Sequence, residues 1–261
     1  MGIGQAVQKS DAVQKVMGTA KFVEDMIPQN ALHAKVLHST VANGLVKSVD
    51  CSEAWKIPGV KAIITCFDVP NIEYVTAGHP LSFDPNHTDV RDRLILSRRV
   101  RFYGDEIAAV AAVDPLTALK AVESIRVEYE EYEPALTPKD AFQAAHPVNP
   151  AYPTNELARL DFSISGSEVT WGKAEFSTEE KIAGRDDLVA DSFSVPAVHA
   201  AHIENNACFA YMEGARMVVV TCNQVPFTTR RNIASALAMP LGSVKVIKPF
   251  LGGGFGNKQD T

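Results

Sequence analysis

The sequence predicts a mixed α/β or α+β protein built from two parts, and three observations carry that prediction. A continuous apolar run at residues 107–113 is followed by a helical pattern from Asp114 and a strand-like run at 125–129. Further along, a helical pattern over 228–239 precedes a strand-like run at 244–247. Strands that alternate with helices favour mixed architectures. The 261 residues, 46% of them hydrophobic, suffice for one large core or two moderate ones.

The first part of the chain is expected to be rich in strands. Residues 32–38 and 44–50 have strand-like patterns, and 51–57 suits a short helix that a Pro-Gly pair ends. A β-rich apolar run covers 60–67. The stretch from 68 to about 94 contains three prolines and no clear period, which is typical of a functional loop or of a segment that packs on a partner.

The helix that follows residue 113 has a clear start signal. Asp114 can accept hydrogen bonds from the first turn, and Pro115 suits the first helical position. Residues 125–129 then close a β-α-β unit. Glu128 and Glu130 share one face of that strand, with apolar residues on the other, so we interpret them as a solvated strand face rather than a metal site.

The second part follows a poorly patterned stretch. Residues 147–185 carry prolines, glycines and charges without a sustained period and are interpreted as a linker. Strand-like runs then occupy 188–194, 208–212 and 217–221, ahead of the helix over 228–239. The helix is amphipathic, and the residues expected to face inward are Ile233, Ala234, Leu237 and Ala238.

The composition argues against several classes of protein. A formal net charge of -6 does not suit a nucleic-acid surface, and no apolar stretch reaches the ~18 residues of a membrane helix. The four cysteines are far apart and form no C-x-x-C pair, which indicates buried, reduced cysteines rather than an iron–sulfur or zinc site. No cationic start followed by an apolar segment marks a signal peptide. The chain is therefore expected to be cytoplasmic.

The most informative segment is the glycine-rich run at residues 250–259, which reads FLGGGFGNKQ. Its four glycines let the backbone approach a ligand closely and aim consecutive N–H groups at it. Nucleotide templates fail: the dinucleotide pattern from Gly252 needs glycine where Asn257 stands, and a P-loop needs Gly-Lys followed by Ser or Thr. The residues alone leave open a tight turn or a site for an oxyanion, phosphate or metal-oxo ligand.

Other polar residues give weaker signals. Gln224 lies between a strand and a helix, where its uncharged amide can face a ligand, although polar residues are common in such turns. His199, His202 and Glu204 resemble a metal site, but histidines three apart converge only on a helix, and a hydrogen-bonded polar loop is favoured. Gln259 can donate and accept hydrogen bonds but cannot serve as a general base.

Together these segments resemble the molybdenum hydroxylases, and most specifically the molybdenum-binding subunit of bacterial xanthine dehydrogenases. Residues 11–22 are similar to the family's start, D-x-x-x-K-V-x-G-x-A-x-[FY]. Each motif is weak, whereas their order and spacing from about residue 11 onward are specific. The other segments that carry the resemblance are Pro58-Gly59-Val60, Asp68-Val69-Pro70, 100–105, 107–118, Gln224-Val225-Pro226 and 248–258.

The resemblance implies an α/β-hammerhead domain at 11–145, a linker at 146–186 and the N-terminal part of a molybdopterin-binding domain at 187–261. It also implies a molybdenum–molybdopterin cofactor, usually in the cytosine dinucleotide form, with iron–sulfur clusters and FAD on partner chains or domains. The implied activity is oxidative hydroxylation of a purine, hypoxanthine or xanthine, with water as the oxygen source.

The resemblance also assigns site residues. Gln224 matches the glutamine that hydrogen-bonds the apical oxo group of the metal, and no residue of this chain is expected to bind the metal directly. The backbone near the molybdenum ligands is matched by Gly253, Gly254, Phe255 and Gly256, and a valine at 254 is expected to disfavour a positive φ and crowd the ligand. Gln259 stands where the mammalian purine enzymes carry a substrate-binding glutamate.

The family's general base, a glutamate in a Gly-x-Gly-Glu-like segment, has no counterpart in this chain. We therefore expect no turnover by this chain alone and a need for the remainder of the molybdenum subunit and for iron–sulfur and FAD subunits. Two alternatives remain: a non-catalytic docking module, or one half of a split subunit that acts on another N-heterocycle or an aldehyde. An autonomous nucleotide-binding domain rests only on the glycine-rich run.

Overall fold

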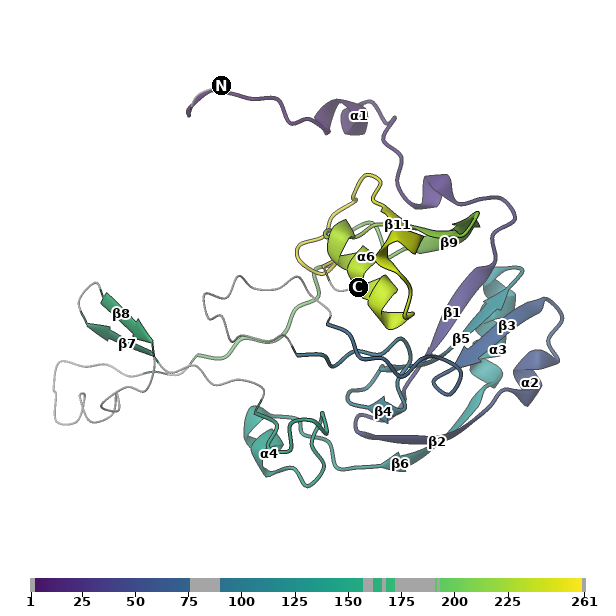
Figure 1. Cartoon of the computed structure of the whole chain (residues 1–261), viewed down its shortest axis with the longest axis vertical. Coiled ribbons are helices and arrows are strands. Elements are labelled where there is room, and N and C mark those ends of the chain that lie inside the picture. Colours follow the sequence, from purple (N-terminus) through teal and green to yellow (C-terminus); the bar gives the residue numbers. More distant parts are fainter. Residues whose placement is uncertain are drawn as a thin grey trace. The chain divides into compact units, whose positions relative to one another are not determined.

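The computed structural model describes residues 3–75, 90–156, 162–165, 168–171, 191 and 193–259. The chain divides into two units, and Figure 1 labels their helices and strands. The larger unit combines Met1–Pro134 with Ala200–Thr261, and the smaller unit is Ala135–His199.

The first part of the larger unit contains two three-stranded antiparallel sheets. The first sheet has the order β1-β5-β3, with bounds His33–His38, Glu106–Ala112 and Val60–Thr65. The second has the order β4-β2-β6, with bounds Arg99–Val100, Gly44–Asp50 and Arg126–Glu131. The strands predicted at 32–38, 44–50, 60–67, 107–113 and 125–129 are therefore confirmed, with end shifts of one or two residues.

Helix α3, Pro115–Ser124, packs on β1 and β5. Its predicted cap is confirmed, because a carboxylate oxygen of Asp114 accepts from the Thr117 N–H at 2.9 Å and the other accepts from the Thr117 hydroxyl at 2.6 Å. These hydrogen bonds stabilise the ionised carboxylate and lower the pKa of Asp114 below its usual value. The short helix expected at 51–57 is α2, Ser52–Trp55.

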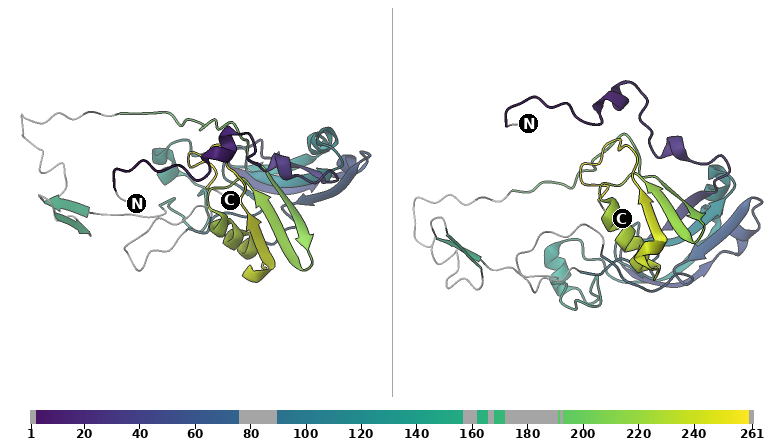
Figure 2. Two further views of the ribbon diagram at one scale, coloured as in Figure 1. Left: turned by 90° about the horizontal axis from the view of Figure 1, so that it is seen from above. Right: turned by 45° about the horizontal axis from the view of Figure 1, so that its top comes forward.

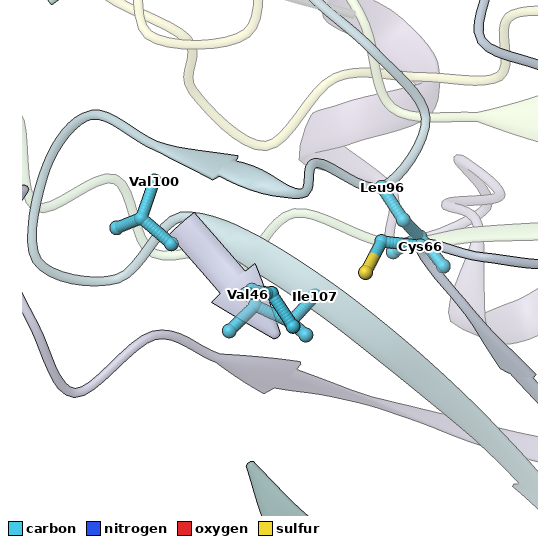
Figure 3. Close-up of a cluster of buried hydrophobic side chains, with 5 residues drawn as sticks. All are labelled: Val46, Cys66, Leu96, Val100 and Ile107. Carbon is cyan, nitrogen blue, oxygen red and sulfur yellow. The ribbon is translucent and has the colours of Figure 1, made fainter. Parts of the chain in front are cut away.

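A cluster of apolar side chains joins the two sheets (Figure 3). Its members come from β2, β4, β5 and the loops between them, and each is at most 7% exposed: Val46, Cys66, Leu96, Val100 and Ile107. Burial raises the pKa of the Cys66 thiol to about 11, so this side chain behaves as a neutral apolar group. A second cluster combines side chains of α2, α3 and β5 with the residue that follows α3: Ala54, Ala121, Val122, Val110 and Ile125.

One expectation about this part is wrong in detail. Strands β5 and β6 flank α3 in sequence but belong to different sheets, so the predicted β-α-β unit does not form within one sheet. The glutamates of β6 do lie on a solvated strand face, where Glu130 pairs with Lys47 at 2.5 Å and Glu128 accepts from Ser48 at 3.1 Å. Of the irregular stretch at 68–94, residues 76–89 lie outside the described residues.

The second part of the larger unit is a three-stranded sheet of order β11-β10-β9. The bounds are Val244–Ile247, Arg216–Thr221 and Cys208–Glu213. Strand β10 is antiparallel to β9 and parallel to β11, and α6, Pro226–Ala236, connects the two parallel strands and packs on β11 (Figure 2). The short 3-10 turn η2, Leu241–Ser243, leads into β11. Strand β10, helix α6 and strand β11 thus form a β-α-β unit.

Helix α6 differs from its prediction at both ends. It begins at Pro226 because proline suits the first helical position, and it ends at Ala236 because Ala238 has a φ of 52°, outside the helical region. Ala238 is exposed rather than inward-facing, whereas Ala234 is buried as predicted. Two polar side chains, Thr229 and Asn232, are buried on the inner face instead.

The smaller unit contains α4, Pro138–Gln143, and a hairpin of β7, Phe162–Ser165, with β8, Glu168–Trp171. The hairpin lies in the stretch where the sequence showed no period. The strand predicted at 188–194 falls mainly outside the described residues, and the part that is described is not a strand.

At the start of the chain, α1, Ala12–Val16, and the 3-10 turn η1, Glu24–Met26, precede the first sheet. The cysteines are free, but only Cys66 and Cys222 are buried; Cys51 is half-buried and Cys208 exposed, so the prediction of four buried cysteines is half right. Among the residues that the structure describes, no helix has the length and apolar character needed to cross a bilayer.

Candidate functional site

The candidate site lies where the parallel strands β10 and β11 end. The carboxyl ends of parallel strands meet at one edge of a sheet, and loops at that edge commonly bind ligands. Here the turn that contains Gln224 follows β10 and the glycine-rich segment follows β11, drawn in yellow in Figure 1. The two segments contact each other, because the Gln224 N–H donates to the Lys258 carbonyl at 2.8 Å. Residues 252–258 are called the glycine loop below.

The side chain of Gln224 is held by the glycine loop. Its Oε1 accepts from the N–H groups of Gly256 at 3.1 Å and Lys258 at 3.3 Å. These contacts fix which end of the amide faces the loop backbone and leave Nε2 as a donor. Within the part of the chain that the structure describes, Nε2 makes no hydrogen bond. The amide of Gln224 therefore has a neutral donor available, and its role toward a ligand stays a prediction.

The glycines are required for two different reasons. A Cβ on Gly252 would lie 2.4 Å from Cβ of Glu204, and a Cβ on Gly254 would lie 2.6 Å from Cδ of Gln224, so these positions leave no room for a side chain. Gly253 instead has a φ of 100°, which favours glycine. Gly254 has no positive φ, so the expectation that valine would fail there through backbone strain is wrong, and the reason is contact with Gln224.

The centre of the glycine loop offers three consecutive N–H groups, those of Gly253, Gly254 and Phe255. None of them donates a hydrogen bond within the described residues, whereas the flanking Gly252 N–H donates to Oε2 of Glu204 at 2.9 Å. Gly254 is buried, and a buried N–H without an acceptor is costly and rare. Together with Nε2 of Gln224, these donors suit a ligand that carries negative charge on oxygen or sulfur.

Phe255 differs from the other residues of the loop. It has a φ of 50°, which is uncommon for a residue with a side chain, and its ring is 80% exposed. Strained backbone of this kind clusters at ligand sites. The glycine loop thus carries an exposed aromatic ring beside its free N–H groups. Gln259, at the end of the loop, is exposed, and its own N–H donates to the Gly256 carbonyl at 3.1 Å, so its role toward substrate stays a prediction.

The segment at 202–204 forms the other wall of the site, which the sequence analysis did not foresee. Lys258 Nζ lies 2.7 Å from Oε2 of Glu204, with the two side chains only 1% and 13% exposed. No local pattern reveals this pair, because its members are 54 residues apart in the sequence.

His202 completes that wall. Its Nδ1 bonds the Glu204 carbonyl at 2.6 Å, and its Nε2 bonds the Asn257 amide at 3.0 Å. His202 and Glu204 thus belong to a hydrogen-bonded polar loop, which is the predicted interpretation. Across the described ranges, no group of three or more His, Cys, Asp or Glu side chains is placed to hold a metal ion.

Comparisons with known proteins agree with both parts of the fold. A family model for the aldehyde oxidase and xanthine dehydrogenase a/b hammerhead domain matches residues 17–133, and one for the molybdopterin cofactor-binding domain matches residues 162–261. The chain belongs to the aldehyde oxidase and xanthine dehydrogenase family of molybdenum hydroxylases. Residues 17–133 are therefore called the hammerhead region, and the sheet β11-β10-β9 with α6 and the glycine loop is called the cofactor region.

Individual relatives cover nearly the whole chain. It is 36% identical over 252 residues to the putative xanthine dehydrogenase molybdenum-binding subunit XdhA of Escherichia coli K12, a match that spans 96% of this chain and 32% of that protein. It is 30% identical to the nicotinate dehydrogenase large molybdopterin subunit of Eubacterium barkeri, over 99% of this chain and 56% of that subunit. The chain thus spans about a third of the xanthine dehydrogenase relative that it matches.

A solved structure supports the fold directly. The aldehyde oxidoreductase from Desulfovibrio gigas superposes with a TM-score of 0.78 at 27% identity, over 95% of this chain and 27% of that one. The predicted fold class, a hammerhead followed by molybdopterin-binding structure, is confirmed.

Proposed function

We propose that this chain supplies cofactor-contacting residues of a molybdenum hydroxylase that oxidatively hydroxylates a purine, hypoxanthine or xanthine, with water as the source of oxygen. The observation that carries the proposal is the row of free N–H groups at Gly253, Gly254 and Phe255 beside the Gln224 amide. Because this region matches the molybdopterin cofactor-binding model, we take the molybdopterin cofactor as the ligand of these N–H groups.

The residues present fit such a cofactor. The space beside Gly252 and Gly254 is already filled by Glu204 and Gln224, so the loop backbone is held in place before any ligand binds. Nε2 of Gln224 would donate to an electronegative ligand atom of the cofactor, and the N–H groups of the loop would stabilise negative charge next to it. When bound, the molybdenum–molybdopterin group supplies the redox chemistry of the hydroxylation.

The proposal extends to parts that this chain does not carry. The remainder of the molybdenum subunit supplies the general-base glutamate. Iron–sulfur and FAD partners carry the electrons away. The cytosine dinucleotide form of the cofactor and a cytoplasmic location belong to the same proposal. Alone, the chain is proposed to be inactive, because the family's general-base glutamate has no counterpart in it and the carboxylate of Glu204, beside the glycine loop, is paired with Lys258.

The purine assignment rests on the relative of higher identity, whose printed name is that of a xanthine dehydrogenase subunit. A second candidate is another N-heterocycle or an aldehyde, which the relatives named nicotinate dehydrogenase and aldehyde oxidoreductase favour. The exposed Gln259 in place of a glutamate also weakens a purine contact. The activity of the complete enzyme on hypoxanthine, xanthine, nicotinate and aldehydes separates the two candidates. The purine assignment requires activity on xanthine and hypoxanthine.

The experiment that tests cofactor binding is Gln224→Glu in the holoprotein. Glutamate keeps an oxygen for the N–H groups of Gly256 and Lys258 but replaces the free donor with negative charge. We expect molybdenum per protein to fall by about tenfold or more, because a charge-assisted hydrogen bond is worth roughly 1.5–3 kcal/mol and is replaced by repulsion.

The matched control is Gln143→Glu, an exposed amide at the end of α4, which should leave the molybdenum content unchanged. Full molybdenum content in Gln224→Glu would contradict the assignment of Gln224. Wild-type protein that never contains molybdenum would favour the non-catalytic docking module instead.

A further inference from the structure

We propose that the buried Lys258–Glu204 ion pair is a positioning element that holds the free N–H groups of the glycine loop in their ligand-binding arrangement. The inference rests on the proposed function for the identity of the ligand. Lys258 is 2% exposed, which is rare for a lysine, and its Nζ lies 2.7 Å from Oε2 of Glu204.

Lys258 connects the glycine loop to Glu204 on one side and to Gln224 on the other. Its side chain pairs with Glu204, while its N–H donates to Oε1 of Gln224 and its carbonyl accepts from the Gln224 N–H. One residue thus connects the two side chains that lie against the glycine loop. Loss of its charge would release the end of the loop from Glu204 without removing the backbone contacts to Gln224.

Glu204 holds the other end of the loop. Its Oε2 accepts from the Gly252 N–H at 2.9 Å as well as from Lys258, and its own N–H donates to the Gly252 carbonyl at 3.2 Å. The loop is therefore fixed at 252 by Glu204 and at 256 and 258 by Gln224, and the three residues between these anchors keep their N–H groups free. Such an arrangement sets the direction of the free groups.

Stability does not account for this pair. Burying two charges costs solvation energy that their attraction often only offsets, and replacement by apolar residues is frequently neutral or stabilising. Oε1 of Glu204 is buried and has no hydrogen-bond partner among the described residues, so the pair is not fully satisfied. In this proposal the pair has a directional role, because it holds the backbone of the glycine loop in one arrangement.

The pair does not itself contact the ligand in this proposal. The donors that face the ligand are Nε2 of Gln224 and the N–H groups at 253–255. The charged groups of Lys258 and Glu204 instead pair with each other. Lys258 and Glu204 are accordingly positioning residues. Their effect on the cofactor should be separable from their effect on the stability of the fold.

The test compares the wild-type holoprotein with Lys258→Met, with the apolar double variant Glu204→Leu/Lys258→Met and with Lys258→Arg. Thermal stability, molybdenum per protein and amide hydrogen exchange at Gly252 and Gly256 in the cofactor-free form are measured for each. Lys258→Met leaves a buried carboxylate unpaired and is expected to lose stability. The double variant removes both charges and is expected to regain the wild-type midpoint.

The expected result is that the double variant, although stable, exchanges Gly252 and Gly256 at least tenfold faster and holds at least fivefold less molybdenum than wild type. Lys258→Arg, which keeps the charge, should retain most of both properties. The control Lys245→Met removes an exposed pair with Glu213, at 3.5 Å, and should change neither.

Two outcomes would decide against the inference and against the function separately. A stable double variant with wild-type exchange and molybdenum content overturns the positioning role and leaves the proposed function intact. A wild-type protein without molybdenum overturns the function, while the exchange rates of the cofactor-free forms still decide whether the pair sets the loop.

Discussion

The hammerhead region and the glycine loop are stabilised by different kinds of contact. In the hammerhead region, side chains such as Val46, Val100 and Ile107 are fully buried among other apolar groups. Around the glycine loop, the charged side chain of Lys258 is buried, and polar contacts hold the backbone: its ion pair with Glu204 and hydrogen bonds between side chains and backbone. Apolar burial is nearly non-directional, whereas a hydrogen bond fixes both distance and angle.

The difference indicates a division of roles within one chain. The apolar clusters supply the free energy that keeps the two antiparallel sheets together, and they tolerate changes of shape as long as volume is kept. The polar contacts of the loop contribute less net stability but hold the backbone in one arrangement. Substitutions in the first region should therefore change stability, and substitutions in the second should change ligand binding.

The largest stability effect is expected from Ile107→Ala. Ile107 is fully buried in the cluster that joins the two sheets, and truncation leaves a cavity. The free energy of unfolding, measured by denaturant titration, should fall by roughly 2–5 kcal/mol. Leu116→Ala, at a position that is 59% exposed on α3, serves as control and should change it by less than about 0.5 kcal/mol. Equal losses at both positions would contradict the central role of this cluster.

A smaller change in stability with a large change in binding is expected from Gly254→Ala. The new Cβ would lie 2.6 Å from Cδ and Oε1 of Gln224 and must displace that side chain or the loop. We expect molybdenum per protein to fall about tenfold, while the free energy of unfolding falls by roughly 1–3 kcal/mol, the usual cost of overpacking at one site. Gly242→Ala adds the same atom where nothing lies within 4 Å and should leave molybdenum content unchanged.

The smallest effect is expected at the cap of α3. Because hydrogen bonds from Thr117 lower the pKa of Asp114 in the folded state, the ionised cap stabilises the fold above the unfolded pKa of about 3.9. That contribution is lost as the pH falls through the lower folded pKa. Asp114→Ala should therefore lower the melting temperature at pH 7, and by less at pH 3.

Asp114→Asn isolates the titration, since asparagine caps helices but carries no charge. It should keep most of the stability at pH 7 and lose the acid dependence that Asp114 contributes. A difference between wild type and Asp114→Ala that is the same at pH 7 and pH 3 would show that the carboxylate charge has no part in the cap.

The sequence alone determined the local elements with strong chemical signals. The apolar run at 107–113, the cap at Asp114 and the helix before β11 follow from patterns that act over a few residues. The sequence also singles out Gln224 and the glycines at 252–256, because an amide between a strand and a helix and a glycine-rich run are visible without a fold, and their role toward a cofactor stays a prediction. Both ends of α6 differ from the prediction, because the helix begins at Pro226 and because Ala238 adopts a positive φ that no alanine signals.

Only the tertiary structure decided what lies beside those elements. Strands β5 and β6 lie in different sheets, and Glu204 pairs with Lys258 although 54 residues separate them in the sequence. Glycine is needed at 254 because a side chain would collide with Gln224, and not because of its backbone conformation. These facts depend on packing between distant segments, where a side chain's partner is set by the path of the whole backbone. Local patterns record what a residue can do, and the partner that it meets is fixed when the parallel strands β10 and β11 bring their ends together.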